Sequence, residues 1–272
     1  DNHFLLQPGE NGEFDVMTCT EAHDLETSGL DDISIPVGPV TYENNSGNGP
    51  FIATLVVNDG KYLQYGKYRL MLCGSTSITD LAENPLNNGE DVILDFTLYK
   101  LPDELPVTGF KQGGVTLLPE QVQTSVYSSS EMVLSLPSLG VSAEIVGVPL
   151  ESDGWNTAWL GNDAGYLEGS AFPTTEGNTV ITGHVWTSTN KPGIFLNLNT
   201  LKYGDEVKIY AWGNVYTYQV RSNFLVSDTN VSYVMQSEDT DWLTLLTCDG
   251  YDPVTGTYAY RRVIRAVLIS ID

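Results

Sequence analysis

The chain has few basic residues. Of its 272 residues, 12 are Lys or Arg and 35 are Asp or Glu, so the formal net charge is -23 at pH 7. Nucleic acids are bound through clustered Lys and Arg, and anionic lipid headgroups attract polybasic segments. The composition therefore argues against both as partners. An acidic surface favours solubility and permits the binding of extracellular cations.

Long apolar runs are also absent. No stretch approaches the roughly 20 apolar residues of a transmembrane helix, and no basic segment leads into the apolar core of a signal peptide. The hydrophobic fraction is nevertheless 41%, which is enough for packed cores. We therefore expect the mature extracellular part of a protein, in one large or two ordinary domains, with any membrane anchor outside this sequence.

Cysteine and histidine are scarce. The three cysteines are Cys19, Cys73 and Cys248, an odd number. In an exported protein the economical interpretation is a disulfide between Cys19 and Cys73, which leaves Cys248 as a free thiol. Of the three histidines, only His184 lies beyond residue 100. Chemistry in the second half of the chain therefore has a single imidazole available.

Short β-branched and aromatic runs between Asn-Gly and Asp-Gly turn signals predict an all-β protein. Residues 1–100 have the strand spacing of a small β-sandwich, and the stretch GKYRLMLCGSTSITDLAENPLNNGEDVILDF resembles bacterial Ig-like modules. In residues 131–272, about eight strands with little helix predict a closed β-barrel. Residues 194–198 are expected to form a short helix after Pro192. Residues 101–130, rich in Pro, Gly and Ser, are predicted to be a linker.

Cys248 ends a buried strand predicted over 241–248 and precedes an Asp-Gly turn. A nucleophile at such a place is held by the sheet and exposed at the turn. A reactive thiolate needs a base or a cationic neighbour. His184 ends another predicted strand, and Arg261 and Arg262 begin the last one. Because adjacent strand residues face opposite sides, only one of the two arginines can face the thiol.

Four segments resemble the sortase family in the order that the family has them, over roughly residues 130–272. They are LSLPSLGVSAEIVGVPL, VITGH, GIFLNLNTLKYGDEV and TLLTCDGYDPVTGTYAYRRVIRA. The resemblance implies an eight-stranded β-barrel with short helices. It also implies a cysteine transpeptidase that cleaves an LPxTG-like sorting signal between Thr and Gly and transfers the acyl group to an amine.

The same resemblance implies the roles of the site residues. Cys248 matches the nucleophile and His184 the general acid and base. Arg261 matches the arginine that stabilises the oxyanion, with Arg262 as its rival, and both Arg262 and Thr247 are candidates for substrate binding. The implied partners are a sorting-signal protein and an amine acceptor, which could be a cell-wall precursor or a pilin lysine. The implied location is the bacterial cell surface, anchored in the membrane, and we expect a monomer.

No cofactor or metal is predicted. Some sortases use Ca²⁺ to order a substrate loop, and acidic pairs such as 31–32, 90–91, 205–206 and 238–239 could bind it. None of them completes a Ca²⁺-loop pattern, so solvated charge is the expected role.

The predicted linker contains Leu105-Pro106-Val107-Thr108-Gly109, which matches the LPxTG signal. A sorting signal is expected to precede a membrane span, whereas this one precedes the predicted enzyme domain. Three interpretations stay open: a plain linker, a pseudo-substrate that occupies its own groove in cis and lowers activity, and a site of self-processing.

Two other functions remain alternatives. The barrel could be catalytically silent in a surface adhesion or stalk protein, with Cys248 only a small buried hydrophobe. It could also be a thiol peptidase that only hydrolyses. Reaction of Cys248 with a thiol reagent separates the first alternative from the transpeptidase, and diversion of the product by an added amine separates the second.

Overall fold

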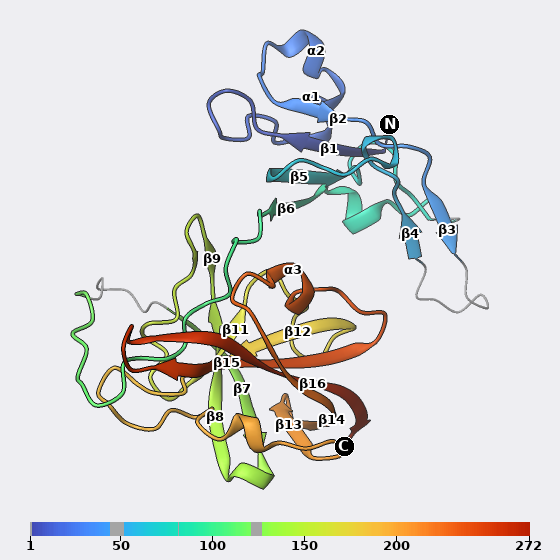
Figure 1. The fold of residues 1–272 in the computed structure, drawn as a ribbon. Coiled ribbons are helices and arrows are strands. Elements are labelled where there is room, and N and C mark those ends of the chain that lie inside the picture. The colour runs from blue at the N-terminus through green and yellow to red at the C-terminus, as the bar shows by residue number, and fades with distance from the viewer. Residues whose placement is uncertain (1, 44–51, 81, 121–126) are drawn as a thin grey trace. The chain divides into compact units, whose positions relative to one another are not determined.

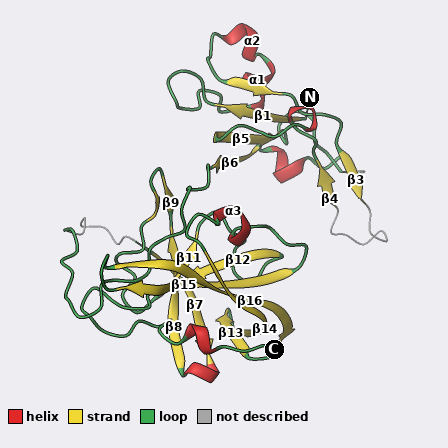
Figure 2. Cartoon of the chain, in the orientation of Figure 1, coloured by secondary structure: helices red, strands yellow, loops and turns green. Residues whose placement is uncertain are grey.

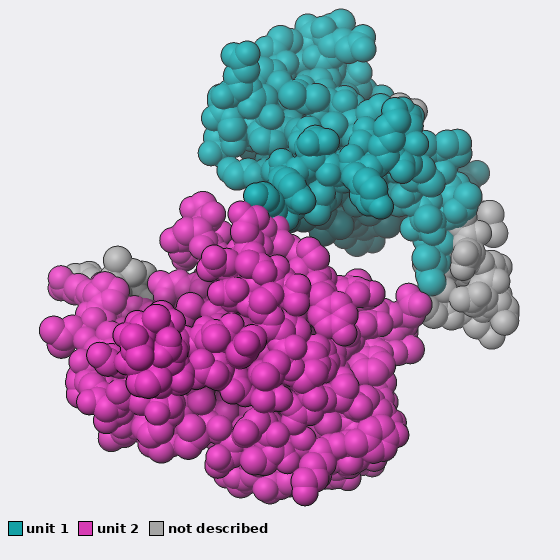
Figure 3. Space-filling model, in the orientation of Figure 1, with its two compact units in different colours: residues 1–100 teal, residues 101–272 magenta. Residues whose placement is uncertain are grey.

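The computed structural model describes residues 2–43, 52–80, 82–120 and 127–272. These residues form two compact units, Asp1–Lys100 and Leu101–Asp272, which Figure 3 shows in different colours. Strands dominate both units (Figure 2), which confirms the all-β prediction. Within the described ranges, no helix is long and apolar enough to cross a membrane.

The first unit contains a four-stranded antiparallel sheet with the strand order β2-β1-β5-β6 (Figure 1) and a two-stranded ribbon of β3 and β4. Its described strands are β1 (His3–Gln7), β2 (Ile33–Ile35), β3 (Thr41–Glu43), β4 (Ile52–Thr54), β5 (Gly66–Leu72) and β6 (Val92–Leu98). Its described helices are α1 (Cys19–His23), α2 (Leu25–Ser28), η1 (Asn58–Gly60) and η2 (Leu86–Gly89). The Ig-like assignment of this unit stays a prediction.

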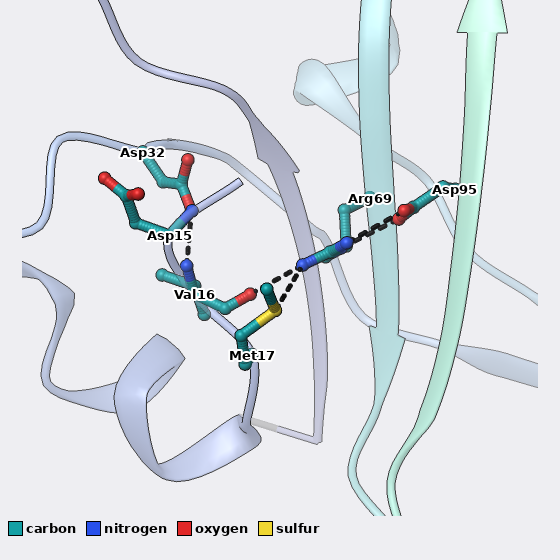
Figure 4. A network of polar contacts seen from close by, with 6 residues as sticks. All are labelled: Asp15, Val16, Met17, Asp32, Arg69 and Asp95. Carbon is teal, nitrogen blue, oxygen red and sulfur yellow. Dashed lines mark hydrogen bonds and ion pairs between the residues drawn. The ribbon is translucent and has the colours of Figure 1, made fainter. Parts of the chain in front are cut away.

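A disulfide and a set of hydrogen bonds connect the N-terminal segment of this unit to its sheet. A disulfide joins Cys19 in α1 to Cys73 at the end of β5. In Figure 4, Arg69 donates to both carboxylate oxygens of Asp95 at 2.8 Å and to the Val16 carbonyl at 2.9 Å. These contacts satisfy a guanidinium that is otherwise buried, and a buried charge without such partners would be costly.

The second unit is a closed barrel with the strand order β11-β12-β15-β16-β14-β13-β7-β8. This confirms the predicted eight-stranded barrel. The barrel strands are β7 (Ser128–Leu136), β8 (Val141–Val148), β11 (Ala164–Leu167), β12 (Gly177–Thr182), β13 (Glu206–Ala211), β14 (Asn214–Val226), β15 (Asp241–Asp252) and β16 (Thr257–Ile271). Other elements described here are β9 (Leu150–Glu151), β10 (Gly154–Trp155), η3 (Pro137–Leu139), η4 (Leu198–Thr200) and α3 (Val231–Val234).

The central strands of the barrel are apolar on both faces. Ile181, Leu243 and Leu245 belong to the main core cluster, whereas Val180 and Leu246 belong to a second cluster. A strand that is covered on both sides has no solvent face, so apolar residues can occupy adjacent positions. Val180-Ile181 in β12 and Leu245-Leu246 in β15 are such pairs, and the two strands pair in parallel.

The segment that follows His184 differs from the predicted short helix over 194–198. The chain makes turns there, and η4 begins only at Leu198. The N–H of Phe195 donates to the His184 carbonyl at 3.1 Å, while the side chains of Phe195 and Leu198 fill the main core. Tertiary packing against the end of β12 therefore overrides the local helical preference.

Replacing both disulfide cysteines with Ser should destabilise the first unit alone. The two residues are 54 apart in sequence, for which the chain-entropy model gives about 4 kcal/mol. All five tryptophans lie between residues 155 and 242, so their fluorescence reports on the barrel. We expect urea unfolding followed by far-UV circular dichroism to show an earlier transition, with the tryptophan transition unchanged. An unchanged circular dichroism curve would contradict this.

Candidate functional site

Strand pairing brings the predicted histidine and cysteine to the same edge of the barrel. β12 and β15 are parallel, and Thr182 is the register partner of Leu246. His184 and Cys248 each lie two residues further along, and neighbouring strands are about 4.8 Å apart. The Thr247 hydroxyl donates to the Gly183 carbonyl at 2.7 Å and so fixes the segment that carries His184.

The antiparallel pairing of β15 with β16 decides which arginine faces the thiol. Cys248 lies opposite Arg261, and Thr247 lies opposite Arg262. Directly opposite residues point to the same face. Arg261 is buried with Cys248, whereas the Arg262 guanidinium binds the Asp249 carboxylate at 2.8 Å and the Asn223 side chain at 3.0 Å.

Burial controls the protonation of the pair. Desolvation raises the pKa of the Cys248 thiol, while the charge of Arg261 and hydrogen bonds from Thr108 act in the opposite direction. Desolvation also lowers the pKa of His184. Because a low-dielectric site penalises the charged form of each group, both shifts favour a neutral thiol beside a neutral imidazole.

The His184 ring is almost completely enclosed. Neither ring nitrogen has a hydrogen-bond partner of acceptable geometry among the described residues. Backbone groups of Thr108, Thr157 and Ala158 are close enough to raise the pKa of His184 in part, but desolvation outweighs them. The Phe110 ring packs on the imidazole with a centroid distance of 5.0 Å. Unsatisfied imidazole nitrogens in a closed site are available to exchange a proton with a reacting group.

The LPVTG segment lies on these residues. The Thr108 N–H donates to the Cys248 sulfur at 3.1 Å, and the Cys248 N–H donates to the Thr108 hydroxyl at 3.2 Å. The Thr108 carbonyl accepts from the Val185 N–H at 2.8 Å. Arg261 donates through Nε to the Pro106 carbonyl at 3.0 Å. The predicted linker is thus part of the second unit here, and its residues 121–126 lie outside the described ranges.

Further contacts hold the segment on both sides of Thr108. The Leu105 N–H donates to the Asp228 carbonyl at 2.7 Å, and the Thr157 hydroxyl donates to the Val107 carbonyl at 2.9 Å. Beyond Gly109, the Phe110 N–H donates to the Trp186 carbonyl at 3.1 Å. These contacts satisfy backbone groups on both sides of Thr108 that would be costly to bury without partners.

The side chains of the LPVTG segment differ in how closely the groove encloses them. Leu105 is only 2% exposed and belongs to the cluster on the outer side of β12 and β15. Val107 is 60% exposed, whereas Thr108 is completely buried. A Cβ added to Gly109 would lie 2.5 Å from the Tyr258 ring and 2.8 Å from a Val185 methyl. The groove thus encloses Leu, leaves the third position free, encloses Thr and admits only Gly at the fifth.

Several contact residues have no signal that sequence reasoning used. Val185 and Asp228 act through backbone atoms, which any residue would supply. Thr157 lies in a loop far from the cysteine in sequence. Tyr258 could have been found, because it lies only three residues before Arg261 at the start of the last strand. Its hydroxyl donates to the Phe110 carbonyl at 3.2 Å.

The structure also bears on metal binding. In the described ranges, the group of metal-type ligands is Cys19, Cys73 and Asp91, and its two sulfurs are bonded to each other. The acidic pairs contain carboxylates that protein groups already bind. Asp32 accepts from Val16 N–H, and Glu238 pairs with Arg265 at 2.7 Å. These contacts supply structural roles for the carboxylates concerned.

Comparison with known proteins identifies the family. The family model of the sortase domain matches residues 134–269, half of the chain, and the chain therefore belongs to the sortase family of transpeptidases. Sortases act at the bacterial cell surface on LPxTG-type sorting signals and amine acceptors. A search of curated proteins found no match.

Solved structures of sortases are similar to this chain. A sortase D5 transpeptidase from Clostridium perfringens is 27% identical, over 51% of this chain and 78% of its own, with a TM-score of 0.42. Sortase C-1 from Actinomyces oris is 25% identical, over 51% and 73%, with a TM-score of 0.43. Sortase A from Corynebacterium diphtheriae is 27% identical, over 52% and 61%, with a TM-score of 0.44.

The Gly109→Ala substitution should expose the thiol. Its Cβ would collide with Tyr258 and Val185 and expel the segment from the groove. Cys248 is 1% exposed with the segment in place, so we expect alkylation by iodoacetamide to become at least about tenfold faster. The matched control is Gly114→Ala, because a Cβ there meets nothing within 4 Å. Equal alkylation rates in both variants would contradict the buried geometry.

Proposed function

We propose that this sortase cleaves LPxTG-like sorting signals between Thr and Gly through a thioacyl intermediate on Cys248. The observation that carries the proposal is the fit of LPVTG to the groove beside the thiol. Leu105 and Thr108 are enclosed, Val107 faces solvent and Gly109 has no room for a side chain. A groove with these properties selects the LPxTG pattern and tolerates variation at x.

In the proposed reaction, the Cys248 sulfur attacks the Thr carbonyl carbon and its proton passes to His184. The imidazole then protonates the leaving Gly nitrogen. An incoming amine attacks the thioester, loses its proton to His184 and releases the thiol. The lowered pKa of His184 keeps the imidazole neutral in the resting enzyme and able to accept the first proton.

Stabilisation of the oxyanion is assigned to the Val185 N–H, because it donates to the Thr108 carbonyl at 2.8 Å. A fixed backbone donor in a dry site is effective against developing negative charge. Arg261 donates to the carbonyl two residues earlier, at Pro106. We therefore propose that Arg261 aligns the substrate backbone and, by its charge, opposes the rise in the thiol pKa that desolvation causes. Thr247 acts by fixing the His184 segment through Gly183.

The acceptor amine is proposed to enter from a cleft beside Cys248 that LPVTG leaves open. The cleft is lined by Trp186, Leu196, Tyr251 and Arg262, among others. An entry separate from the peptide groove lets an amine reach the thioester before water does, which favours transpeptidation over hydrolysis. A cell-wall precursor or a pilin lysine would supply such an amine.

We further propose that LPVTG inhibits the enzyme in cis. A tethered segment has an effective concentration in the millimolar range, so a free substrate must compete with it. Within residues 105–110, the Thr108 N–H binds the Cys248 sulfur, and the carbonyls of Pro106 and Val107 are bound by the barrel. The docked segment therefore covers the thiol. Displacement of the segment would then precede each turnover on a substrate in trans.

Cleavage of a fluorogenic LPxTG peptide tests the mechanism. We expect Cys248→Ala to abolish cleavage and Arg261→Lys to reduce kcat/KM by at least about 100-fold, because Lys cannot reproduce the guanidinium geometry. Arg262→Lys should cost less than about fivefold in peptide cleavage, since Arg262 binds Asp249 and lines the acceptor cleft instead of contacting the peptide. Activity in Cys248→Ala, or a larger loss for Arg262 than for Arg261, would refute these roles. Addition of triglycine should divert the product to the amide.

The Leu105→Ala substitution tests the inhibition in cis. Loss of a buried Leu side chain weakens docking by about 2 kcal/mol, or roughly 30-fold. We expect the apparent KM for a peptide added in trans to fall by up to this factor. Val107→Ala is the control, because Val107 is exposed and its side chain contributes little. An unchanged KM in Leu105→Ala, with the barrel still folded by tryptophan fluorescence, would show that the segment does not compete.

A further inference from the structure

The docked segment has the features of a substrate and not only those of an inhibitor. A blocking segment needs to fill the groove, but it needs neither Thr next to the thiol nor Gly after it. This segment has both residues, and the Thr108 carbonyl accepts a hydrogen bond from the Val185 N–H at 2.8 Å. The Thr108 nitrogen is 3.1 Å from the Cys248 sulfur. The Thr108 carbonyl carbon is two covalent bonds away from that nitrogen, at a distance of about 2.5 Å.

The chain is also held independently on the leaving side of the Thr108–Gly109 bond. Phe110 is bound through its N–H to Trp186 and through its carbonyl to Tyr258. The Gly113 N–H donates to the Asn190 side chain at 2.9 Å, and the Thr116 N–H donates to the Ser188 carbonyl at 2.8 Å. These contacts do not depend on the integrity of the Thr108–Gly109 bond.

We propose that the enzyme is its own acyl donor: it cleaves Thr108–Gly109 reversibly and can transfer the fragment 1–108 to an external amine. This inference rests on the proposed function and extends it to a specific substrate, the first unit of the same chain. Cleavage at this bond breaks the covalent link between residues 1–100 and the barrel strands, because the first unit precedes the bond and β7 to β16 follow it.

The chemistry balances without any other reactant. The Cys248 sulfur bonds to the Thr108 carbonyl carbon, the C–N bond to Gly109 breaks, and the thiol proton passes by way of His184 to the Gly109 nitrogen. The reverse step forms the amide again, and the sulfur recovers a proton. When an external amine attacks instead, it takes the acyl group, the C–S bond breaks and the amine proton returns to the thiol.

Retention of the leaving group determines the outcome. The new Gly109 amine stays beside the thioester because residues 110–116 remain bound. Well-oriented intramolecular nucleophiles have effective molarities of about 10⁵–10⁸ M, far above any free amine. The chain therefore remains intact at equilibrium, and cleavage becomes visible only when a nucleophile removes the acyl group irreversibly.

Intact mass spectrometry of the full chain in hydroxylamine tests the proposal. We expect slow formation of a 1–108 hydroxamate and a 109–272 fragment that begins with Gly109, with no cleavage in Cys248→Ala. Tyr258→Phe should accelerate the conversion by about tenfold, because it removes the hydroxyl that binds the Phe110 carbonyl and so weakens retention of the amine, while the ring beside Gly109 is kept. Lys111→Ala is the matched control, since this exposed neighbour should leave the rate unchanged.

The outcomes separate this inference from the proposed function. A wild-type chain that stays intact in hydroxylamine, while Gly109→Ala cleaves a free LPVTG peptide, overturns self-cleavage and leaves the transpeptidase in place. If neither the chain nor the free peptide is cleaved, the proposed function fails together with the inference. Equal conversion in Tyr258→Phe and Lys111→Ala would overturn the role of the retained amine.

Discussion

The site depends on the register of three adjacent strands. Parallel pairing of β12 with β15 places His184 and Cys248 at one edge, and antiparallel pairing of β15 with β16 places Arg261 opposite Cys248. A slip of one residue in either pair would turn these side chains to opposite faces. Buried hydrogen bonds hold the register of β12 and β15, from the Thr244 hydroxyl to Asn178 and from the Thr247 hydroxyl to the Gly183 carbonyl, because a slip would leave these groups unpaired.

Enclosure by the chain's own segment gives the site its electrostatic character. Once water is excluded, the thiol and the imidazole both favour their neutral forms. In this low-dielectric site, the hydrogen bond from the Val185 N–H to the Thr108 carbonyl is electrostatically stronger than it would be in water. A free thiol at the cell surface is exposed to oxidation, and cover by the segment limits that access. The same contacts thus protect the nucleophile and position the bond next to it.

The sequence was sufficient for much of this arrangement and insufficient for the rest. The thiol, the single imidazole and the two arginines could be found because few residues of those types exist in the second half. The preference for Arg261 over Arg262 rested on a family pattern, and the structure supplies the physical reason in the pairing with Cys248. The LPVTG match was visible, but its three interpretations could not be separated, because docking depends on tertiary contacts.

Other features were hidden for physical reasons. Backbone donors such as Val185 N–H have no side-chain signature, and Thr157 joins the groove only through the fold. Residues 101–120 have the composition of a linker, because Pro, Gly and polar residues interrupt their apolar residues and leave no helix or strand periodicity. Leu105 and Thr108 are nevertheless buried, because a preformed groove accepts an extended backbone that local periodicity does not reveal.

Hydrogen–deuterium exchange of the native chain tests most directly whether residues 105–110 occupy the groove. The N–H groups of Leu105, Thr108 and Phe110 are all bonded to the barrel. Strong protection of peptides that span these residues, lost in Gly109→Ala and kept in Gly114→Ala, is the predicted result. Exchange of these amides at the rate of an unstructured peptide in the native chain would contradict the docked segment and the specificity inferred from it.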